Sequence, residues 1–279
     1  MERRWILIYD NYNGLEKTAI DMLSGVISGY LNYVLPIKNI KEITDDKIKN
    51  SNLLWIGKIK NNHLLSFLNK NGLIEVPNKA EGYGIFVGES PWEKDKQIIA
   101  IAGFDSRGVL YGCMDFCNRY CGDILYRTGY LCGKTFFENR FDEKLTEWKI
   151  STAPMIKTRA IWTWGHVIYD YREFFRNMVR IRLNEIVIWN DVAPINAKEV
   201  VEYAHSLGIK VIWGFAWGWG TSCTQILEEF NEETAQKIKE SVLKKYEEEY
   251  SLIGGDGIIF NLLLNLIKIA WQGNALQRS

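Results

Sequence analysis

The sequence has no excess of charge of either sign, because lysine and arginine total 34 and aspartate and glutamate also total 34. Proteins that bind nucleic acids or anionic membrane surfaces usually carry a basic excess, so the balance argues against both kinds of partner. With 279 residues, the chain is long enough for one large domain or two smaller ones, each with its own core.

Cysteine is scarce, and its five copies are odd in number, which argues against a disulfide framework. Cys113, Cys117 and Cys121 recur at four-residue spacing and therefore share one face of a helix. Zinc ligands usually have shorter spacings, and buried thiols behave as small apolar residues. We therefore expect core packing for these three residues and no bound metal.

Long apolar runs are missing too. The stretch 257–271 is interrupted by Asn261, Asn265 and Lys268 and is short of the ~20 apolar residues of a membrane-spanning helix. The amino terminus begins with basic residues but continues directly into a short strand pattern, unlike a signal peptide. A cytoplasmic protein without a membrane segment is the default expectation.

The first half of the chain mixes short strand patterns with helical ones, which predicts an α+β domain with helices on one face of a sheet. The expected strands cover 5–9, 53–57, 84–88 and 97–103, and the expected helices cover 15–34 and the segment that begins at Asp105.

After a linker expected at 142–157, strand and helix patterns alternate, with strands near 160, 186, 211 and 258. Capping boxes are expected at Asp170 with Glu173 and at Asn196 with Glu199, and Gly208 is typical of a helix end. The alternation predicts parallel strands joined by crossover helices. A full barrel needs eight strands and ~250 residues, so only half of one is present.

The predicted fold class is therefore α/β, with a small α+β N-terminal domain followed by an incomplete (β/α) TIM-type barrel. The expected divisions are 1–150 for the α+β domain, 151–260 for the half-barrel and 261–279 for a tail.

Tryptophan is abundant, with eleven copies that crowd into the second half. Three apolar runs, 161–164, 186–191 and 211–219, each change at their carboxyl end into tryptophan with Asn, Asp or Gly. In a barrel these strand ends form the floor of the active site. Indole rings there make flat apolar walls, which suit the faces of a sugar ring.

The tryptophan candidates for this site are Trp164, Trp189, Trp213, Trp217 and Trp219. Alternation along a strand puts Trp162 and Trp164 on one side of the first strand, and Trp213 and Phe215 on one side of the third. Some of these side chains must therefore fill the barrel or face the helices. We expect Trp164, Trp189 and Trp217 to face the ligand.

Asn190 and Asp191 follow the second strand directly. One interpretation is that Asp191 binds sugar hydroxyls, and the other is that it caps a helix or loop.

Four segments together resemble a known architecture. Gly103-Phe-Asp-Ser-Arg-Gly-Val-Leu-Tyr-Gly112 resembles the end of the accessory N-terminal domain of α-glucuronidases and β-N-acetylhexosaminidases. Segments 158–165, 184–191 and 208–214 resemble the first three barrel strands of those glycoside hydrolases. The resemblance implies hydrolysis of O-glycosyl bonds in an oligosaccharide substrate without a cofactor.

The resemblance also implies that the main catalytic acid is absent, because the proton donor of these enzymes lies on the fourth strand or later. Glycoside hydrolysis normally needs two carboxylates. After Phe260 a strand of this kind is expected to continue into polar residues ending in a glutamate, whereas this chain continues Asn-Leu-Leu-Leu-Asn265. We interpret the residues after Phe260 as out of frame and the chain as an inactive fragment with unknown catalytic residues.

Two other hypotheses stay open. One is a non-catalytic carbohydrate-binding protein that uses the tryptophans alone. The other is an unrelated parallel α/β enzyme, although the sequence has no glycine-rich phosphate-binding turn. The sequence determines neither the sugar nor the oligomeric state.

Overall fold

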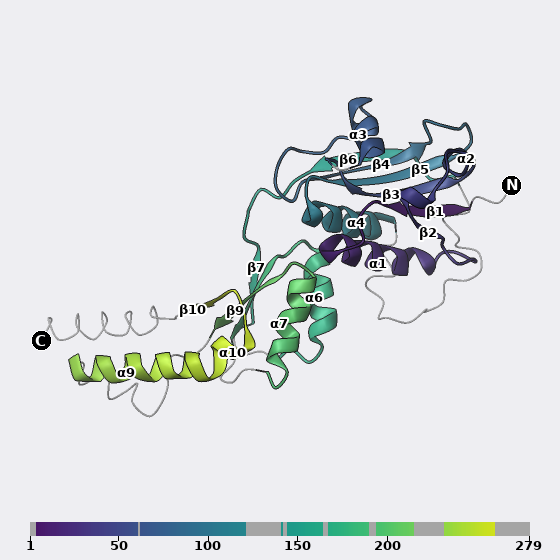
Figure 1. Ribbon diagram of the computed structural model, residues 1–279. Coiled ribbons are helices and arrows are strands. Elements are labelled where there is room, and N and C mark those ends of the chain that lie inside the picture. Colours follow the sequence, from purple (N-terminus) through teal and green to yellow (C-terminus); the bar gives the residue numbers. More distant parts are fainter. Residues whose placement is uncertain are drawn as a thin grey trace, which may run out of the picture. The chain divides into compact units, whose positions relative to one another are not determined.

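A computed structural model describes residues 4–60, 62–120, 141, 144–163, 167–189, 194–214 and 232–259. The chain forms two compact units, each built around its own sheet (Figure 1). The first unit comprises Met1–Lys157 and Val179–Arg182, and the second comprises Thr158–Met178 and Leu183–Ser279. The predicted α/β class, an α+β unit beside a partial TIM-type barrel, is confirmed. The domain limits 1–150, 151–260 and 261–279 stay predictions.

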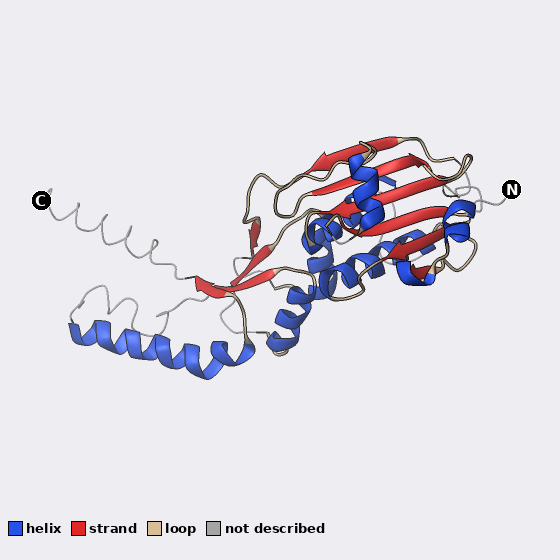
Figure 2. Cartoon of the chain, turned by 45° about the horizontal axis from the view of Figure 1, so that its top comes forward, coloured by secondary structure: helices blue, strands red, loops and turns tan. Residues whose placement is uncertain are grey.

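The first unit contains a six-stranded sheet with the order β2-β1-β3-β5-β4-β6 (Figure 2). Strands β2, β1, β3 and β5 run parallel, whereas β4 is antiparallel to both of its neighbours, β5 and β6. The bounds are β1 Trp5–Tyr9, β2 Ile37–Asn39, β3 Asn52–Lys58, β4 Tyr83–Glu89, β5 Gln97–Gly103 and β6 Trp148–Thr152. The four strands expected in this half are thus confirmed.

Helices cover both faces of this sheet, so the expectation of helices on one face was wrong. Helices α1 (Gly14–Ser28) and α4 (Ser106–Tyr120) pack together on one face. Short helices α2 (Asp45–Asn50) and α3 (His63–Lys70) contribute to a core on the other. The physical reason is visible in β3, which is buried almost continuously and therefore needs cover on both sides.

Strand β6 lies inside the segment that was expected to be a linker. It pairs antiparallel with β4, and Ile150 lies opposite Ile85. Along β6, half-buried Trp148, Ile150 and Thr152 alternate with exposed residues. This period-two pattern is typical of a strand that covers a core with one side only. Strand β6 was not predicted from the sequence because the residues around it are charged and Pro154 follows it.

The segment 103–112, which carried the resemblance, holds α4 against the sheet. Asp105 accepts hydrogen bonds from the backbone N–H groups of Gly108 (2.8 Å) and Glu81 (2.9 Å). Arg107 forms an ion pair with Glu81 at 3.1 Å. At Gly108 a Cβ atom would lie 2.2 Å from the carbonyl oxygen of Gly82. These residue types therefore serve helix packing.

Helix α1 ends earlier than the sequence pattern predicted, at Ser28, with Gly29 as its C-cap. In helix α4, Cys113 and Cys117 are buried free thiols, as expected of core residues. Burial raises the pKa of the Cys113 thiol, which keeps it protonated. The described residues contain no group of His, Cys, Asp or Glu suited to a metal ion. Cys121 lies outside the described residues.

The second unit contains a four-stranded sheet with the order β10-β9-β8-β7, and every neighbouring pair is parallel. The strands are β7 Ala160–Trp162, β8 Glu185–Trp189, β9 Lys210–Gly214 and β10 Gly257–Ile259. Helices α6 (Tyr171–Arg180) and α7 (Ala197–Ser206) alternate with the strands, and α9 (Glu232–Lys245) with α10 (Ser251–Ile253) precedes β10. The four expected parallel strands are thus confirmed.

The helix ends of this unit follow the sequence signals in two of three cases. The carboxylate of Asp170 accepts the backbone N–H of Glu173 at 2.9 Å, as expected of a cap. Gly208 has a φ of +72° and donates to the His205 carbonyl, which ends α7 in the manner expected of glycine. Asn196, however, makes no side-chain cap and instead donates to the Glu199 carboxylate at 3.4 Å.

Among the helices that the structure describes, none combines the length and apolar character needed to cross a membrane.

Candidate functional site

The carboxyl ends of the four parallel strands all lie at one edge of the second unit's sheet. In parallel α/β folds the loops that follow the strands gather at this edge, and ligands usually bind there. Four of the five predicted site residues, Trp164, Asn190, Asp191 and Trp217, lie outside the described residues. Trp189 is described, and it is the last residue of β8.

The two faces of this sheet differ in burial. Ile186, Ile188, Val211 and Trp213 share one face, and each is at most 3% exposed. Helix α7 packs against β9 on this side. The opposite face, which we call the tryptophan face, carries Trp162 of β7, Glu185, Val187 and Trp189 of β8, and Ile212 and Gly214 of β9. In a barrel the face turned away from the helices lines the interior.

Trp162 and Trp189 form an aromatic pair on the tryptophan face. Their ring centroids are 5.5 Å apart and their planes are inclined by 39°. Trp162 is 41% exposed, and Trp189 is half-buried. Sequence alternation placed Trp162 on the same side as Trp164, but we selected only Trp164. Recognising Trp162 requires the register between β7 and β8. In that register Trp162 lies opposite Val187, two residues before Trp189 on the neighbouring strand.

Gly214 lies beneath Trp189. A Cβ atom at Gly214 would be 2.5 Å from Cε3 of the Trp189 indole and 3.1 Å from Val187. A contact below 3.0 Å forces something to move, so glycine is what allows the indole to lie against β9.

Thr163 ties the ends of β7 and β8 together. Its backbone N–H donates to the carbonyl of Val187 at 3.0 Å, and its hydroxyl donates to the same carbonyl at 3.3 Å. The hydroxyl oxygen accepts the backbone N–H of Trp189 at 3.0 Å. Thr163 is only 5% exposed, so these bonds are shielded from water. They hold the backbone from which both indoles project.

Trp213 points the other way and belongs to the core. Its indole N–H donates to the Gly254 carbonyl at 2.8 Å, and its ring meets Tyr250 edge-on at 5.8 Å. The side chain is 3% exposed. Trp213 therefore contacts no ligand on the tryptophan face, in line with the alternation that made some of the tryptophans packing residues.

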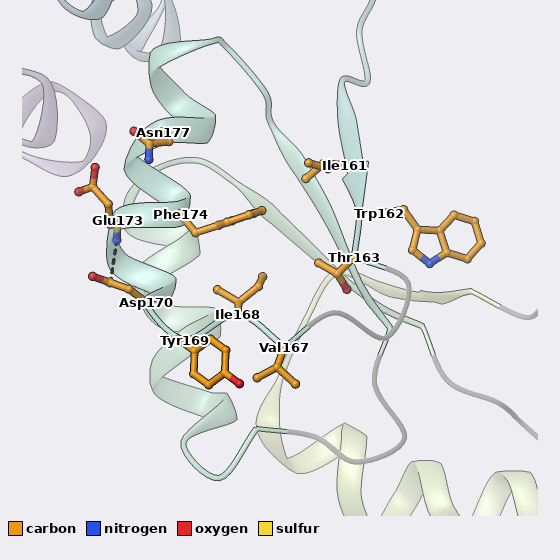
Figure 3. A pocket seen from close by; sticks show the side chains of 10 residues that line it. All are labelled: Ile161, Trp162, Thr163, Val167, Ile168, Tyr169, Asp170, Glu173, Phe174 and Asn177. Atoms are coloured by element: carbon orange, nitrogen blue, oxygen red, sulfur yellow. Dashed lines mark hydrogen bonds between the residues drawn. The ribbon is translucent and has the colours of Figure 1, made fainter. Parts of the chain in front are cut away.

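A cavity of about 510 Å³ lies beside β7 and extends to helix α6 (Figure 3). Its lining residues are Ile161, Trp162, Thr163, Val167, Ile168, Tyr169, Asp170, Glu173, Phe174 and Asn177. Figure 3 shows Trp162 directed away from the side where Phe174 and Ile168 lie. The cavity and the tryptophan face therefore adjoin opposite sides of β7.

Both acids of this cavity are engaged by helix α6. Asp170 caps the helix through the backbone N–H of Glu173, and Glu173 lies 3.8 Å from the guanidinium of Arg176. On the tryptophan face, the acid within the described strands is Glu185, at the amino end of β8. The described residues thus place two indoles near the carboxyl edge, while the two carboxylates of the cavity are held in contacts with helix α6.

No protein-family model matches the sequence, and no curated protein matches it. The structure is similar to that of CpGH84D, a protein of glycoside hydrolase family 84, with a TM-score of 0.55 and 14% identity. The match covers 98% of this chain and 45% of that one. A glycoside hydrolase family 20 exo-β-N-acetylglucosaminidase from Vibrio harveyi gives a TM-score of 0.41 at 12% identity, covering 76% and 33%.

The family 84 match shows a distant glycoside hydrolase-like fold, without selecting a family. The chain spans less than half the length of either matched protein.

Proposed function

We propose that this chain binds carbohydrate on its tryptophan face without hydrolysing it. The observation that carries the proposal is the Trp162–Trp189 pair, which lies at the carboxyl ends of parallel strands in a glycoside hydrolase-like fold. Indole faces pack against the C–H face of a pyranose, and indole N–H groups donate to hydroxyls.

The surroundings of the pair support ligand contact rather than core packing. Trp213 shows what a core tryptophan of this sheet looks like, with its N–H bonded to a backbone carbonyl and its ring buried. Trp162, in contrast, keeps 41% of its surface exposed. A partly exposed aromatic pair at a strand-end edge is typical of a binding surface.

The four other predicted residues complete this proposal. Trp164 follows β7, Asn190 and Asp191 follow β8, and Trp217 follows β9, so each continues from a carboxyl end at the same edge. In the proposed site Trp164 and Trp217 extend the aromatic surface, and Asn190 and Asp191 bind sugar hydroxyls. The substrate class is an oligosaccharide or glycoside, and no cofactor takes part.

Hydrolysis of an O-glycosyl bond is the second candidate function, favoured by the fold shared with CpGH84D. The reaction needs a proton donor and a second carboxylate or a substrate acetamido group near the anomeric carbon. We assign neither group to a residue of this chain.

Two measurements on the purified chain test the proposal. Tryptophan fluorescence is followed during titration with N-acetylglucosamine, glucose and their β-1,4-linked oligomers, and release of nitrophenol from nitrophenyl glycosides is followed separately. We expect saturable fluorescence changes with a Kd of about 1 mM or below, and no release of nitrophenol. Trp148→Ala, which removes a half-buried indole from β6 of the first unit, is the matched control and should bind like the wild type.

If no saccharide of the panel changes the fluorescence, carbohydrate binding is disproved. If the wild type releases nitrophenol and the Asp191→Asn variant does not, the function is hydrolysis and not binding alone.

A further inference from the structure

We propose, on the basis of the carbohydrate-binding function above, that the tryptophan face binds two linked sugar rings, one on Trp162 and one on Trp189. A single ring held between the two indoles is the alternative. The choice depends on the spacing, tilt and register of the two side chains.

The spacing excludes a sandwich. The centroids of Trp162 and Trp189 are 5.5 Å apart. Aromatic rings that touch each other have centroid distances of about 4.5–7 Å. The two indoles are therefore already in contact, and no third ring fits between them. Trp162 is 41% exposed and Trp189 is half-buried, so each indole retains surface that a ligand can reach.

The register places the two surfaces at different depths. Trp162 lies opposite Val187, and Trp189 follows Val187 by two positions on β8. At about 3.3 Å per residue, the two backbone positions are offset by about 6.6 Å along the strands. A ligand that covers both indoles must run diagonally across β7 and β8, toward the carboxyl edge. One pyranose ring, similar in size to one indole, covers only one of them.

The tilt is maintained by the backbone below. Trp189 lies against Gly214, whose absent Cβ leaves room for Cε3 of the indole. Thr163 bonds the backbone of Trp189 to the end of β7. The planes are inclined by 39°, and successive rings of a linked saccharide, which are rotated relative to each other, match two platforms tilted in this way.

The test compares the monomer, dimer and trimer of β-1,4-linked N-acetylglucosamine, with glucose, cellobiose and cellotriose as a second series. Isothermal titration calorimetry on the full chain measures the affinities. We expect the dimer to bind about 10-fold tighter than the monomer in at least one series, equivalent to 1.4 kcal/mol for the second ring. The trimer should bind within about 2-fold of the dimer, as expected when two platforms are filled.

Variants separate the two platforms. Trp162→Ala and Trp189→Ala should each bring the dimer down to the affinity of the monomer, while the monomer still binds to the indole that remains. Gly214→Ala retains both indoles but displaces Trp189, because its Cβ would lie 2.5 Å from Cε3, and it should also lose the advantage of the dimer. Trp148→Ala should keep the full advantage.

The outcomes are distinguishable. Equal affinities for monomer and dimer in both series would overturn the two-ring inference and leave carbohydrate binding intact. A trimer that binds a further 10-fold tighter would overturn the limit of two rings. Failure of every saccharide to bind would instead disprove the proposed function itself.

Discussion

The first and second units both alternate strands with helices, but they cover their sheets differently. In the first unit, α1 and α4 lie on one face and α2 and α3 on the other, and β3 is buried almost throughout. In the second unit, the residues of β8 and β9 on the face that meets α7 are buried, while the opposite face carries a tryptophan that is 41% exposed. Tryptophan therefore packs in the core on β1 and β3 of the first unit, where Trp5 and Trp55 are at most 1% exposed, whereas Trp162 on β7 of the second unit stays accessible.

The largest expected effect comes from removing a core tryptophan of the first unit. Trp55 on β3 is 0% exposed, and Trp55→Ala should lower the free energy of unfolding by about 3–5 kcal/mol. Trp162→Ala, at an exposed position, should change it by less than about 1 kcal/mol. Urea unfolding followed by circular dichroism measures both. Similar losses in the two variants would show that Trp162 is a core residue after all.

A smaller effect is expected from adding a methyl group where α4 approaches the sheet. In Gly108→Ala the new Cβ would meet a backbone oxygen at 2.2 Å, and we expect a loss of about 2 kcal/mol from overpacking. Gly25→Ala on α1 is the matched control, since nothing lies within 4 Å of its Cβ position. It should stabilise the helix by about 0.5–1 kcal/mol. Thermal unfolding of both variants checks the contrast, and a harmless Gly108→Ala would contradict the packing role of segment 103–112.

Next comes the buried tryptophan of the second unit. Trp213→Phe removes the N–H that donates to the Gly254 carbonyl, and we expect a loss of about 1 kcal/mol. Hydrogen exchange should speed up at the Asp256 amide, which bonds to the Val211 carbonyl beside β10. Saccharide binding should be unchanged, because Trp213 is on the helix face. Loss of binding in this variant, with the fold retained, would contradict the assignment of the two faces.

The smallest expected effect concerns Asp10, which follows β1 in the first unit. Both of its carboxylate oxygens are buried without a hydrogen-bond partner among the described residues. Burial, and secondarily the charge of Glu16, raises the pKa of Asp10, while the nearby Asn62 amide partly opposes the rise. Lys58 forms an ion pair with Glu16 at 2.9 Å.

A carboxyl whose pKa rises on folding contributes stability that is complete below its unfolded pKa of about 3.9 and is lost as the pH rises through the folded value. Asp10→Asn abolishes this ionisation. The variant should therefore melt about 2 °C above the wild type at pH 8, with the difference shrinking toward pH 4. Thermal midpoints of both proteins measured across this range provide the check. A difference between the two midpoints that grows toward acidic pH would contradict the prediction.

Much of the fold was predictable because period and burial are local properties of the sequence. Strand β1 was predicted at its observed bounds, and the four parallel strands of the second unit were located from apolar runs separated by amphipathic helices. Strand β6 was missed, since its alternation is short and its neighbours are charged. The helices on the second face of the first unit's sheet were not predicted, because the sequence of a strand does not show which element packs against it.

The site was predictable only in part. Trp189 was identified from its position at a strand end, and it lies at the expected edge. Trp162 was overlooked because its importance depends on pairing with a strand that lies more than twenty residues away in the sequence. The positions of Trp164, Asn190, Asp191 and Trp217 remain predictions.

The sequence by itself determined the α/β alternation, the parallel direction of the strands and the concentration of tryptophan near their carboxyl ends, because hydrophobic period and residue order are written along the chain. Only the tertiary structure decided that Trp162 and Trp189 meet, that Gly214 lies beneath Trp189 and that Trp213 faces the helices. Those relations depend on the register between neighbouring strands, and a shift of one residue would have sent each side chain to the other face.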